Sequence, residues 1–204
     1  MEYVMTLLVS YLIGSIPNGL LIGKYFCQVD IRQFGSKNIG ATNAFRVLGP
    51  KPALFVLLTD AAKGIAGVYL GAYLVGTPLG SLAGGIAAIC GHNWPIFLKF
   101  QGGRGVATGL GVIAVLVPKV TAIVFTVWLL IVLVTRYVSL GSIVAAFLVP
   151  VCMWFFQVQM EYFIFGLLAA LFVIYRHKPN IGRLLRGEEL KIKPGNSKNI
   201  VKKE

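Results

Sequence analysis

The segment ALFVLLTDAAKGIAGVYLGAYLV, residues 53–75, indicates the class of this protein. It is long enough to cross a bilayer, which takes about 20 predominantly apolar residues. Its two ionisable side chains, Asp60 and Lys63, lie three residues apart and therefore on one face of a helix. Charged groups inside a span are costly, so the pair indicates either a function or a structural ion pair. The sequence leaves both readings open, and Lys63 is the better candidate to face an anion.

The composition of the whole chain also favours a membrane protein. Hydrophobic residues make up 57% of the 204 residues and charged residues 13%, and the mean hydropathy is +0.80. Soluble domains contain about 25% charged residues. The net charge of +12 does not indicate a nucleic-acid partner, because the cations lie in loops between apolar segments and in the tail. We predict one membrane-embedded domain, residues 1–193, and a basic tail, residues 194–204, for which disorder is expected.

Seven apolar segments predict an all-α, polytopic membrane protein with seven transmembrane helices. The first contains a polar patch with Pro17 and Asn18, where the helix can break. The third and fourth are short and flank the loop 91–105, so they are tilted or broken spans, or a re-entrant pair that would reduce the count to five. The seven segments are residues 3–22, 53–75, 79–90, 106–117, 120–135, 137–156 and 162–175.

The cations predict the orientation of the chain, because lysine and arginine accumulate on the cytoplasmic side. With seven spans and the N-terminus outside, every Lys and Arg except Lys63 and Lys119 falls on the cytoplasmic side or in the cytoplasmic tail. The five-span alternative gives the main loops the same sidedness. The polar stretches 34–46, 91–105, 139–142 and 176–189 then share the inner face, and we expect these four segments to converge on one site.

The stretch FGSKNIGATNAFR, residues 34–46, is a polar island in this apolar chain. Its glycine spacing is that of a nucleotide P-loop, but Ala41 occupies the place of the essential lysine and no strand precedes it. Glycines with accessible backbone N–H groups beside Ser36, Lys37 and Arg46 still suit a phosphate. The alternative is a glycine-rich cytoplasmic loop whose cations only follow the membrane charge rule.

A second glycine-containing loop, GHNWPIFLKFQGGRG, covers residues 91–105. Gly102 and Gly103 permit close approach of the backbone to a ligand, and the guanidinium of Arg104 matches the geometry of phosphate oxygens. His92 and Asn93 precede them. Either residue type fits a binding site, although His92 taken alone is equally well explained as an interfacial histidine with a structural hydrogen bond.

Further polar residues follow towards the C-terminus. Ser139 and Ser142 come after the turn at Arg136, where they bind a ligand or simply cap the sixth helix. His177 and Asn180 belong to the last polar cluster, in which Asn180 has the alternative role of a turn residue.

Several kinds of chemistry are excluded by what the sequence lacks. Two distant histidines and few acidic residues form no recognisable ligand set, so we expect no metal and no other cofactor. A Gly-x-Ser-x-Gly nucleophile elbow is missing. The His-x4-Asp pattern of the common acyl-CoA-dependent acyltransferases is also missing, because Phe97 and Gly182 occupy the positions of the aspartate.

These motifs closely resemble the bacterial PlsY family, the acyl-phosphate:glycerol-3-phosphate acyltransferases. The resemblance covers residues 8–193 in order. Arg104 departs from the family pattern, which usually has lysine there, so the charge is kept but its shape changes. The matching motifs are residues 14–19, 35–43, 60–64, 91–108 and 177–189.

The resemblance implies a seven-span enzyme of the bacterial plasma (inner) membrane with its active site at the cytoplasmic face. Such an enzyme transfers an acyl group from a long-chain acyl phosphate to the 1-hydroxyl of sn-glycerol 3-phosphate. The products are lysophosphatidic acid and inorganic phosphate, in the first acylation step of phospholipid biosynthesis. The implied partners are the two substrates and membrane lipid, without a cofactor, a nucleic acid or an obligatory protein partner.

The resemblance, taken with the chemistry of the side chains, assigns roles to particular residues. His177, Asn180, Ser142 and Arg104 are expected to be catalytic. The expected substrate- and phosphate-binding residues are Ser36, Lys37, Asn38, Gly40, Asn43, Arg46, Lys63, His92, Asn93, Gly102, Gly103, Arg104 and Ser142.

The expected mechanism is direct attack of the substrate hydroxyl on the acyl carbonyl. The proton acceptor is either His177 or His92, whose ordinary pKa near 6.5 suits a general base, or a phosphate oxygen of the substrate itself. Two other classes of protein remain open from the residues alone. A small anion transporter would use the same broken spans and basic pocket, but it needs access from both membrane faces. A noncatalytic lipid-binding scaffold would not need so many buried amides and hydroxyls.

Overall fold

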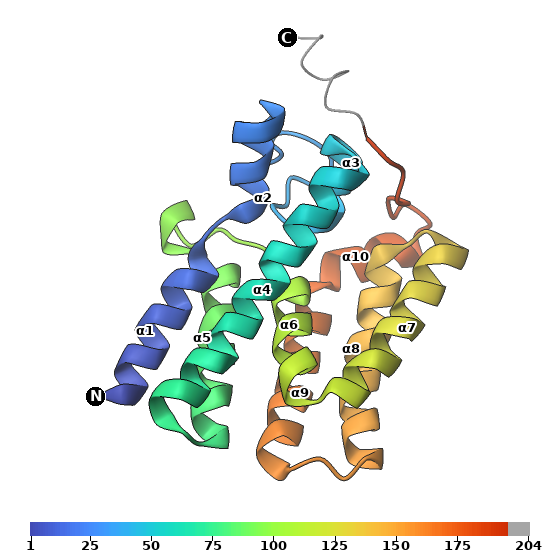
Figure 1. The fold of residues 1–204 in the computed structure, drawn as a ribbon. Coiled ribbons are helices and arrows are strands. Elements are labelled where there is room, and N and C mark those ends of the chain that lie inside the picture. Colours follow the sequence, from blue (N-terminus) through green and yellow to red (C-terminus); the bar gives the residue numbers. More distant parts are fainter. Residues whose placement is uncertain (196–204) are drawn as a thin grey trace. The chain divides into compact units, whose positions relative to one another are not determined.

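The computed structural model describes residues 1–195, and this part of the chain is helical, without strands (Figure 1). It confirms the predicted all-α class. Residues 196–204, most of the predicted tail 194–204, lie outside the described part. The elements are α1 (Glu2–Ser15), α2 (Asn18–Leu21), the π-helix Ile22–Phe26, α3 (Ala41–Leu48), α4 (Pro50–Val75), α5 (Pro78–Asn93), the 3-10 turn Ile96–Leu98, α6 (Val106–Leu116), α7 (Pro118–Thr135), α8 (Val138–Phe155), α9 (Met160–Arg176) and α10 (Lys178–Leu185).

Every predicted apolar segment corresponds to a helix, but the helices differ in how well they suit a bilayer. Among the described residues, four helical segments are long and apolar enough to cross: residues 2–26, α4, α7 and α8. A fifth is added if α9 and α10, which meet at a bend of 55°, count as one span. Helix α6 has only 11 residues, so it is too short to cross unaided. The chain is a multi-pass membrane protein, and the predicted count of seven spans stays a prediction.

The chain divides into two compact units. The first contains Met1–Gly111 together with the tail from Ile192, and the second contains Val112–Lys191. Each unit is described by itself below.

In the first unit, α4 and α5 pack through a glycine seam, which consists of Gly67 and Gly71 on α4 and Gly80 and Gly84 on α5 (Figure 1). A methyl group added to Gly67 would lie 2.5 Å from the carbonyl oxygen of Gly84, so the backbones touch directly. Small residues at helix interfaces are typical of membrane proteins, because apolar side chains gain nothing by leaving lipid and close backbone packing supplies the attraction. The seam fixes α5 on α4.

The first helical span breaks where the polar patch predicted it. Helix α1 ends at Ser15 and α2 starts at Asn18, with Pro17 between them in a non-helical conformation. Proline cannot supply the N–H that would continue the helical hydrogen bonds. The break leaves the carbonyl group of Ile16 available to another element, and α4 uses it, as described below.

Loop 27–40 and the short helix α3 form a small hydrophobic core with the start of α4. Ile31, Val47 and Val56 are at most 3% exposed and lie in its centre. This core anchors the polar stretch 34–46 on apolar residues from three elements.

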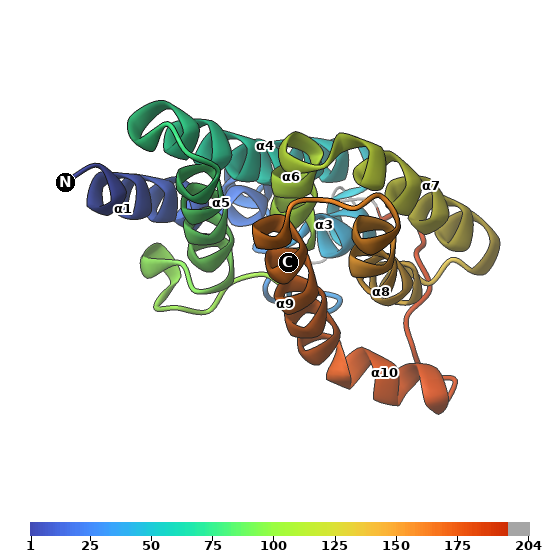
Figure 2. The same cartoon turned by 90° about the horizontal axis from the view of Figure 1, so that it is seen from below.

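The second unit is built from two antiparallel helix pairs, with α8 packed between α7 and α9 (Figure 2). Close contacts again occur at glycines: Gly141 faces the ring of Trp128, and Gly166 faces Met153. Helix α10 turns away from α9 at His177 and contacts both α8 and α9.

Candidate active site

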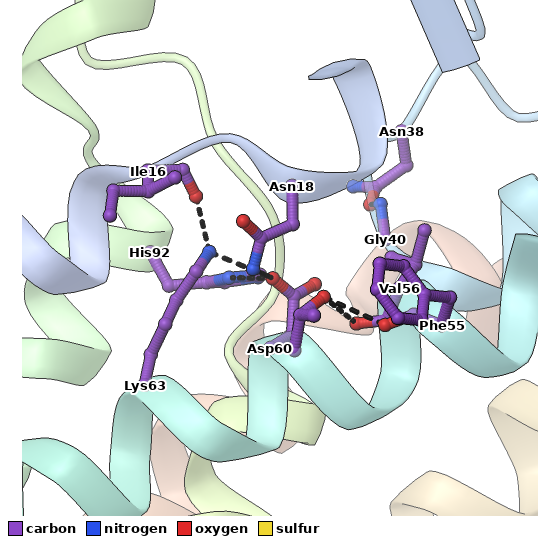
Figure 3. Close-up of polar contacts among 10 residues, drawn as sticks. Ile16, Asn18, Asn38, Gly40, Phe55, Val56, Asp60, Lys63 and His92 are labelled. Atoms are coloured by element: carbon purple, nitrogen blue, oxygen red, sulfur yellow. Dashed lines mark hydrogen bonds and ion pairs between the residues drawn. The ribbon is translucent and has the colours of Figure 1, made fainter. Parts of the chain in front are cut away.

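Asp60 is the centre of a buried polar cluster in the first unit, formed with Asn18, Lys63 and His92 (Figure 3). Asp60 is 2% exposed and its Oδ1 lies 2.7 Å from Lys63 Nζ. Asn18 Nδ2 donates to the same oxygen at 3.2 Å, and His92 Nδ1 lies 3.8 Å from it. The cluster therefore joins the broken first span, α4 and α5.

Lys63 also donates to the carbonyl oxygen of Ile16, at the break in the first span. An ammonium group has three protons, and two of them are engaged by Asp60 and Ile16. One N–H at most is left for the phosphate that the sequence assigned to Lys63. The structure thus shows the ion pair that was one of the two predicted alternatives.

The loop after α5 folds back onto His92. The backbone N–H of Gly103 donates to the carbonyl oxygen of His92 at 3.0 Å, and a methyl group on Gly103 would overlap the imidazole ring. Gly105 has a φ of 76° and faces the side-chain amide of Asn93. Glycine is required at 103 by the close approach to the ring and at 105 by the left-handed backbone.

His92 is 4% exposed, and its ring lies between the Asp60 carboxylate and Gly103. The loop therefore packs on a buried side chain of α5. Asn93 is 1% exposed, and neither atom of its amide has a hydrogen-bond partner among the described residues. A buried amide without partners costs free energy, which favours a ligand or water at this position. Arg104, half-buried, and the start of α6 follow directly.

The other predicted loop is shaped by Asn43, which is 1% exposed on α3. Its Nδ2 donates to the carbonyl oxygens of Ile31 at 2.8 Å and Phe34 at 3.2 Å. Its Oδ1 accepts the backbone N–H of Ser36 at 2.8 Å. Both amide protons are engaged within the loop, so Asn43 positions the loop rather than donating to a substrate.

The predicted binding residues next to Asn43 lie at the surface of this loop. Ser36 and Lys37 are exposed, and Lys37 has a φ of 58°. Asn38 Oδ1 accepts the N–H of Gly40 at 2.8 Å, and Gly40 is the residue from which α3 starts. Arg46 lies half-buried on α3, one turn after Asn43. The loop therefore presents the Ser36 hydroxyl and the Lys37 ammonium group before α3, and Arg46 follows in the last turn of the helix.

Asp30 binds two further cations of this region, Arg32 and Lys24. Arg32 binds it through two contacts, Nε to Oδ1 at 2.9 Å and Nη2 to Oδ2 at 2.7 Å, and Lys24 Nζ lies 3.5 Å away. The hydrogen bonds from Arg32 lower the pKa of Asp30 to about 2 against the opposing effect of burial. Asp30 stays ionised at neutral pH, and Arg32 is therefore held by its carboxylate.

In the second unit, three side chains donate hydrogen bonds to the carboxylate of Glu189. Oε1 accepts from Asn180 Nδ2 at 2.7 Å and from Ser139 Oγ at 2.9 Å, and Oε2 accepts from Arg183 Nε at 2.7 Å. Burial alone raises the pKa of Glu189, but the hydrogen bonds from Asn180, Arg183 and Ser139 outweigh it and place the pKa below its usual value.

Asn180 and His177, both predicted to be catalytic, are buried. Asn180 belongs to this cluster, and His177 precedes Asn180 by three residues in the sequence. Asn180 Oδ1 has no hydrogen-bond partner among the described residues, so an acceptor atom remains. His177 Nδ1 lies 2.8 Å from the carbonyl oxygen of Val173 and donates to it, which makes Nε2 the acceptor nitrogen of the ring. Ser142 donates its only proton to Val138 O and accepts from Trp128, so it can donate to a phosphate only after rotating.

Two residues outside the predicted set of site residues are central to the observed clusters. An amide inside an apolar span needs an internal hydrogen-bond partner, so the sequence predicts one for Asn18, and in the structure Asp60 is that partner. Glu189 is part of the last sequence motif, but the sequence assigns it no role. The available signal for Glu189 is an acidic residue within a strongly basic tail.

Comparison with known proteins gives a consistent result. The family model described as glycerol-3-phosphate acyltransferase matches residues 4–187. Proteins with this name are similar along nearly their whole length: the one from Desulforamulus reducens is 46% identical over 93% of this chain and 94% of its own, and that from Fusobacterium nucleatum is 45% identical over 95% and 100%.

Solved structures show the same fold. A crystal structure of PlsY, an integral membrane glycerol 3-phosphate acyltransferase, in its glycerol 3-phosphate form has a TM-score of 0.88 and 36% identity, over 95% of this chain and 96% of that one. The lysophosphatidic acid form has a TM-score of 0.86 and 35% identity, over 94% and 95%.

Proposed function

The chain belongs to the glycerol-3-phosphate acyltransferase family, and we propose that its acyl donor is a long-chain acyl phosphate. The acyl group passes to the 1-hydroxyl of sn-glycerol 3-phosphate, and the products are lysophosphatidic acid and inorganic phosphate. This is the first acylation of phospholipid biosynthesis. The glycerol 3-phosphate and lysophosphatidic acid forms of the solved relative support the acceptor and the product.

One observation carries the assignment of the binding residues. The first unit contains two glycine-containing loops, each built on a buried polar side chain, Asn43 or His92, and each accompanied by an arginine. Both substrates carry a phosphate, which Arg46 and Arg104 can bind through charge-assisted hydrogen bonds. Exposed loop groups, among them the Ser36 hydroxyl, complete the contacts.

The reaction needs no covalent acyl-enzyme. The hydroxyl oxygen of glycerol 3-phosphate forms a bond to the acyl carbonyl carbon, the bond from that carbon to the phosphate oxygen breaks, and inorganic phosphate leaves with the electron pair. The observed serines fit this scheme, because a nucleophilic serine needs an adjacent base. Ser142 donates to a backbone carbonyl group, which is not a base. Ser139 donates to the Glu189 carboxylate, whose pKa lies below its usual value despite burial and which is therefore a weak base.

The second unit supplies two acceptors that suit a hydroxyl group, His177 Nε2 and Asn180 Oδ1. We assign them to orienting the attacking hydroxyl of glycerol 3-phosphate. Its proton passes either to His177 Nε2 or to a phosphate oxygen of the substrate. If His177→Ala keeps most of kcat at saturating substrate, the phosphate takes the proton; if kcat falls by about 100-fold or more, His177 takes it.

We place the protein in the bacterial plasma membrane, with its N-terminus outside and the loops 27–40 and 94–105 on the cytoplasmic side. The distribution of lysine and arginine supports this orientation. It also suits the substrates, since glycerol 3-phosphate is soluble in the cytosol and a long-chain acyl phosphate partitions into the bilayer.

The test is phosphate release by the purified protein in detergent, with palmitoyl phosphate and glycerol 3-phosphate and without CoA or added metal. We expect release that depends on both substrates. Arg46→Ala and Arg104→Ala should each lower kcat/KM by about 10–100-fold, the loss expected for a hydrogen bond to a charged group. Arg32→Ala is the matched control, because Arg32 is bound to Asp30, and it should stay within about twofold of the wild type.

Two results would contradict the proposal. Acyl transfer from acyl-CoA but not from palmitoyl phosphate would show that the acyl donor is acyl-CoA and not an acyl phosphate. No transfer from either donor, with uptake of glycerol 3-phosphate or phosphate into proteoliposomes, would assign the chain to the anion transporters.

A further inference from the structure

Helix α3 carries Arg46 in its last turn, and the carbonyl groups at this end of the helix need hydrogen-bond donors from outside it. The last four carbonyl groups of a helix have no N–H partner within the helix. Here α3 ends at Leu48, Gly49 follows with a φ of 99°, and Pro50, which has no N–H, starts α4. With eight residues α3 is also too short to be stable alone. Its C-terminal turn therefore depends on contacts from elsewhere.

One such contact comes from the C-terminal residues 192–195, which we call the strap (Figure 1). The backbone N–H of Gly195 donates to the carbonyl oxygen of Phe45 at 2.9 Å. The strap thus supplies a donor to one of the carbonyl groups at the end of α3. It lies beyond residues 4–187, the region matched by the family model.

The contact is between backbones and requires glycine. A methyl group on Gly195 would overlap the carbonyl group of Arg46, which is backbone and cannot turn aside. On the other side, a methyl group on Gly49 would lie 2.8 Å from the carbonyl oxygen of Gly195. Two glycines therefore face each other at the end of α3. Any side chain at 195 would push the strap away from the helix.

We propose that Gly195 is a positioning residue, which acts by holding the last turn of α3 so that Arg46 faces the phosphate of glycerol 3-phosphate. The inference rests on the proposed role of Arg46 in binding that phosphate. The other end of α3 is already fixed by the three hydrogen bonds of Asn43 to the loop. The strap fixes the end that Asn43 does not reach.

The experiment compares Gly195→Ala with Pro194→Ala in the full-length protein. Pro194 is exposed and neighbours the contact, so its variant is the matched control. We expect Gly195→Ala to raise KM for glycerol 3-phosphate about tenfold while kcat changes less than about twofold, because a binding contact weakens and the reacting groups are untouched. Pro194→Ala should match the wild type in both constants.

Two further measurements separate positioning from general destabilisation. Hydrogen exchange of the backbone amides of residues 41–49 should be faster in Gly195→Ala and unchanged in Pro194→Ala. In an Arg46→Ala background, Gly195→Ala should raise KM no further, because the two changes act through one contact.

The proposal is overturned if exchange in α3 is unchanged in Gly195→Ala, if KM does not rise although exchange is faster, or if the KM effect persists without Arg46. A failure of the proposed function has a different signature, since the wild-type protein would then show no acyl transfer. The exchange comparison would still show whether the strap holds α3.

Discussion

Removal of the Asp60 carboxylate should strongly destabilise the protein. Asp60→Ala deletes the 2.7 Å contact to Lys63 and leaves an ammonium group whose side chain is 5% exposed. Breaking a buried ion pair in this way costs about 3–5 kcal/mol, because an uncompensated charge stays behind. For a chain of this length, each kcal/mol lowers Tm by roughly 2–4 °C, so a fall of roughly 6–20 °C is expected.

The measurement is thermal unfolding of the purified protein in a mild detergent, followed by tryptophan fluorescence. The double variant Asp60→Leu/Lys63→Met should recover more than half of the loss, because apolar residues of similar volume replace a buried pair at little net cost. Asp30→Ala is the control for loss of an ion-paired carboxylate whose cationic partners stay in contact with water, and it should cost less than Asp60→Ala, since Lys24 and Arg32 are about half exposed.

The reasoning is refuted if the double variant is as unstable as Asp60→Ala, because the loss would then not come from an unpaired Lys63. It is equally refuted if Asp60→Ala unfolds within about 1 kcal/mol of the wild type.

Three further predictions concern the glycine seam, the Asn43 loop and Glu189. Gly84→Ala should lower Tm clearly, because a methyl group at this position overlaps the carbonyl group of Gly67. Gly109→Ala is the control and should leave Tm unchanged, because the nearest atom would be 4.0 Å from its methyl group. Equal effects of the two changes would contradict close backbone packing at the glycine seam. In steady-state assays, Asn43→Asp should raise KM for glycerol 3-phosphate at least as much as Asn43→Ala does. The reason is that a carboxylate oxygen would face the two carbonyl groups to which Asn43 now donates. An Asn43→Asp enzyme with the KM of the wild type would argue against a role of Asn43 in positioning the loop. Because the pKa of Glu189 is lower in the folded protein than its ordinary value of 4.5, the ionised carboxylate stabilises the fold at any pH above 4.5. This stabilisation is lost as the pH falls through the lower pKa of the folded state. Glu189→Gln should therefore unfold at a lower Tm than the wild type at pH 7, with a difference that shrinks below about pH 4; a difference independent of pH would exclude the charge as its cause.

The helices that correspond to the seven apolar segments were predictable from the sequence, because a long apolar segment is a strong signal. The break at Pro17 was also predictable, since proline removes an N–H and the neighbouring residues are polar. Helices α3 and α10 were not predicted. Each has only eight residues, so its stability comes from tertiary contacts that no local pattern contains.

The candidate site was predictable in residue type more than in role. The sequence identified Asn43 as a residue that binds or orients substrate, whereas the structure engages its amide protons within the loop. The direction in which this amide points depends on backbone atoms outside its own helix, those of residues 31, 34 and 36. Glu189 was missed for the same reason, because its three partners come from positions 139, 180 and 183.

The spacing of Asp60 and Lys63 also bears on how the protein is made. On the scale of membrane insertion, Asp and Lys at the centre of a span each cost about 2.5–3.5 kcal/mol. Because the two residues are three apart on one helix, their charges can pair as soon as α4 is helical. The segment then enters the bilayer without net charge and needs no other helix to be present. Asn18 and His92 can bind the pair afterwards, so α4 is able to insert on its own and later serve as the template on which the neighbouring helices assemble.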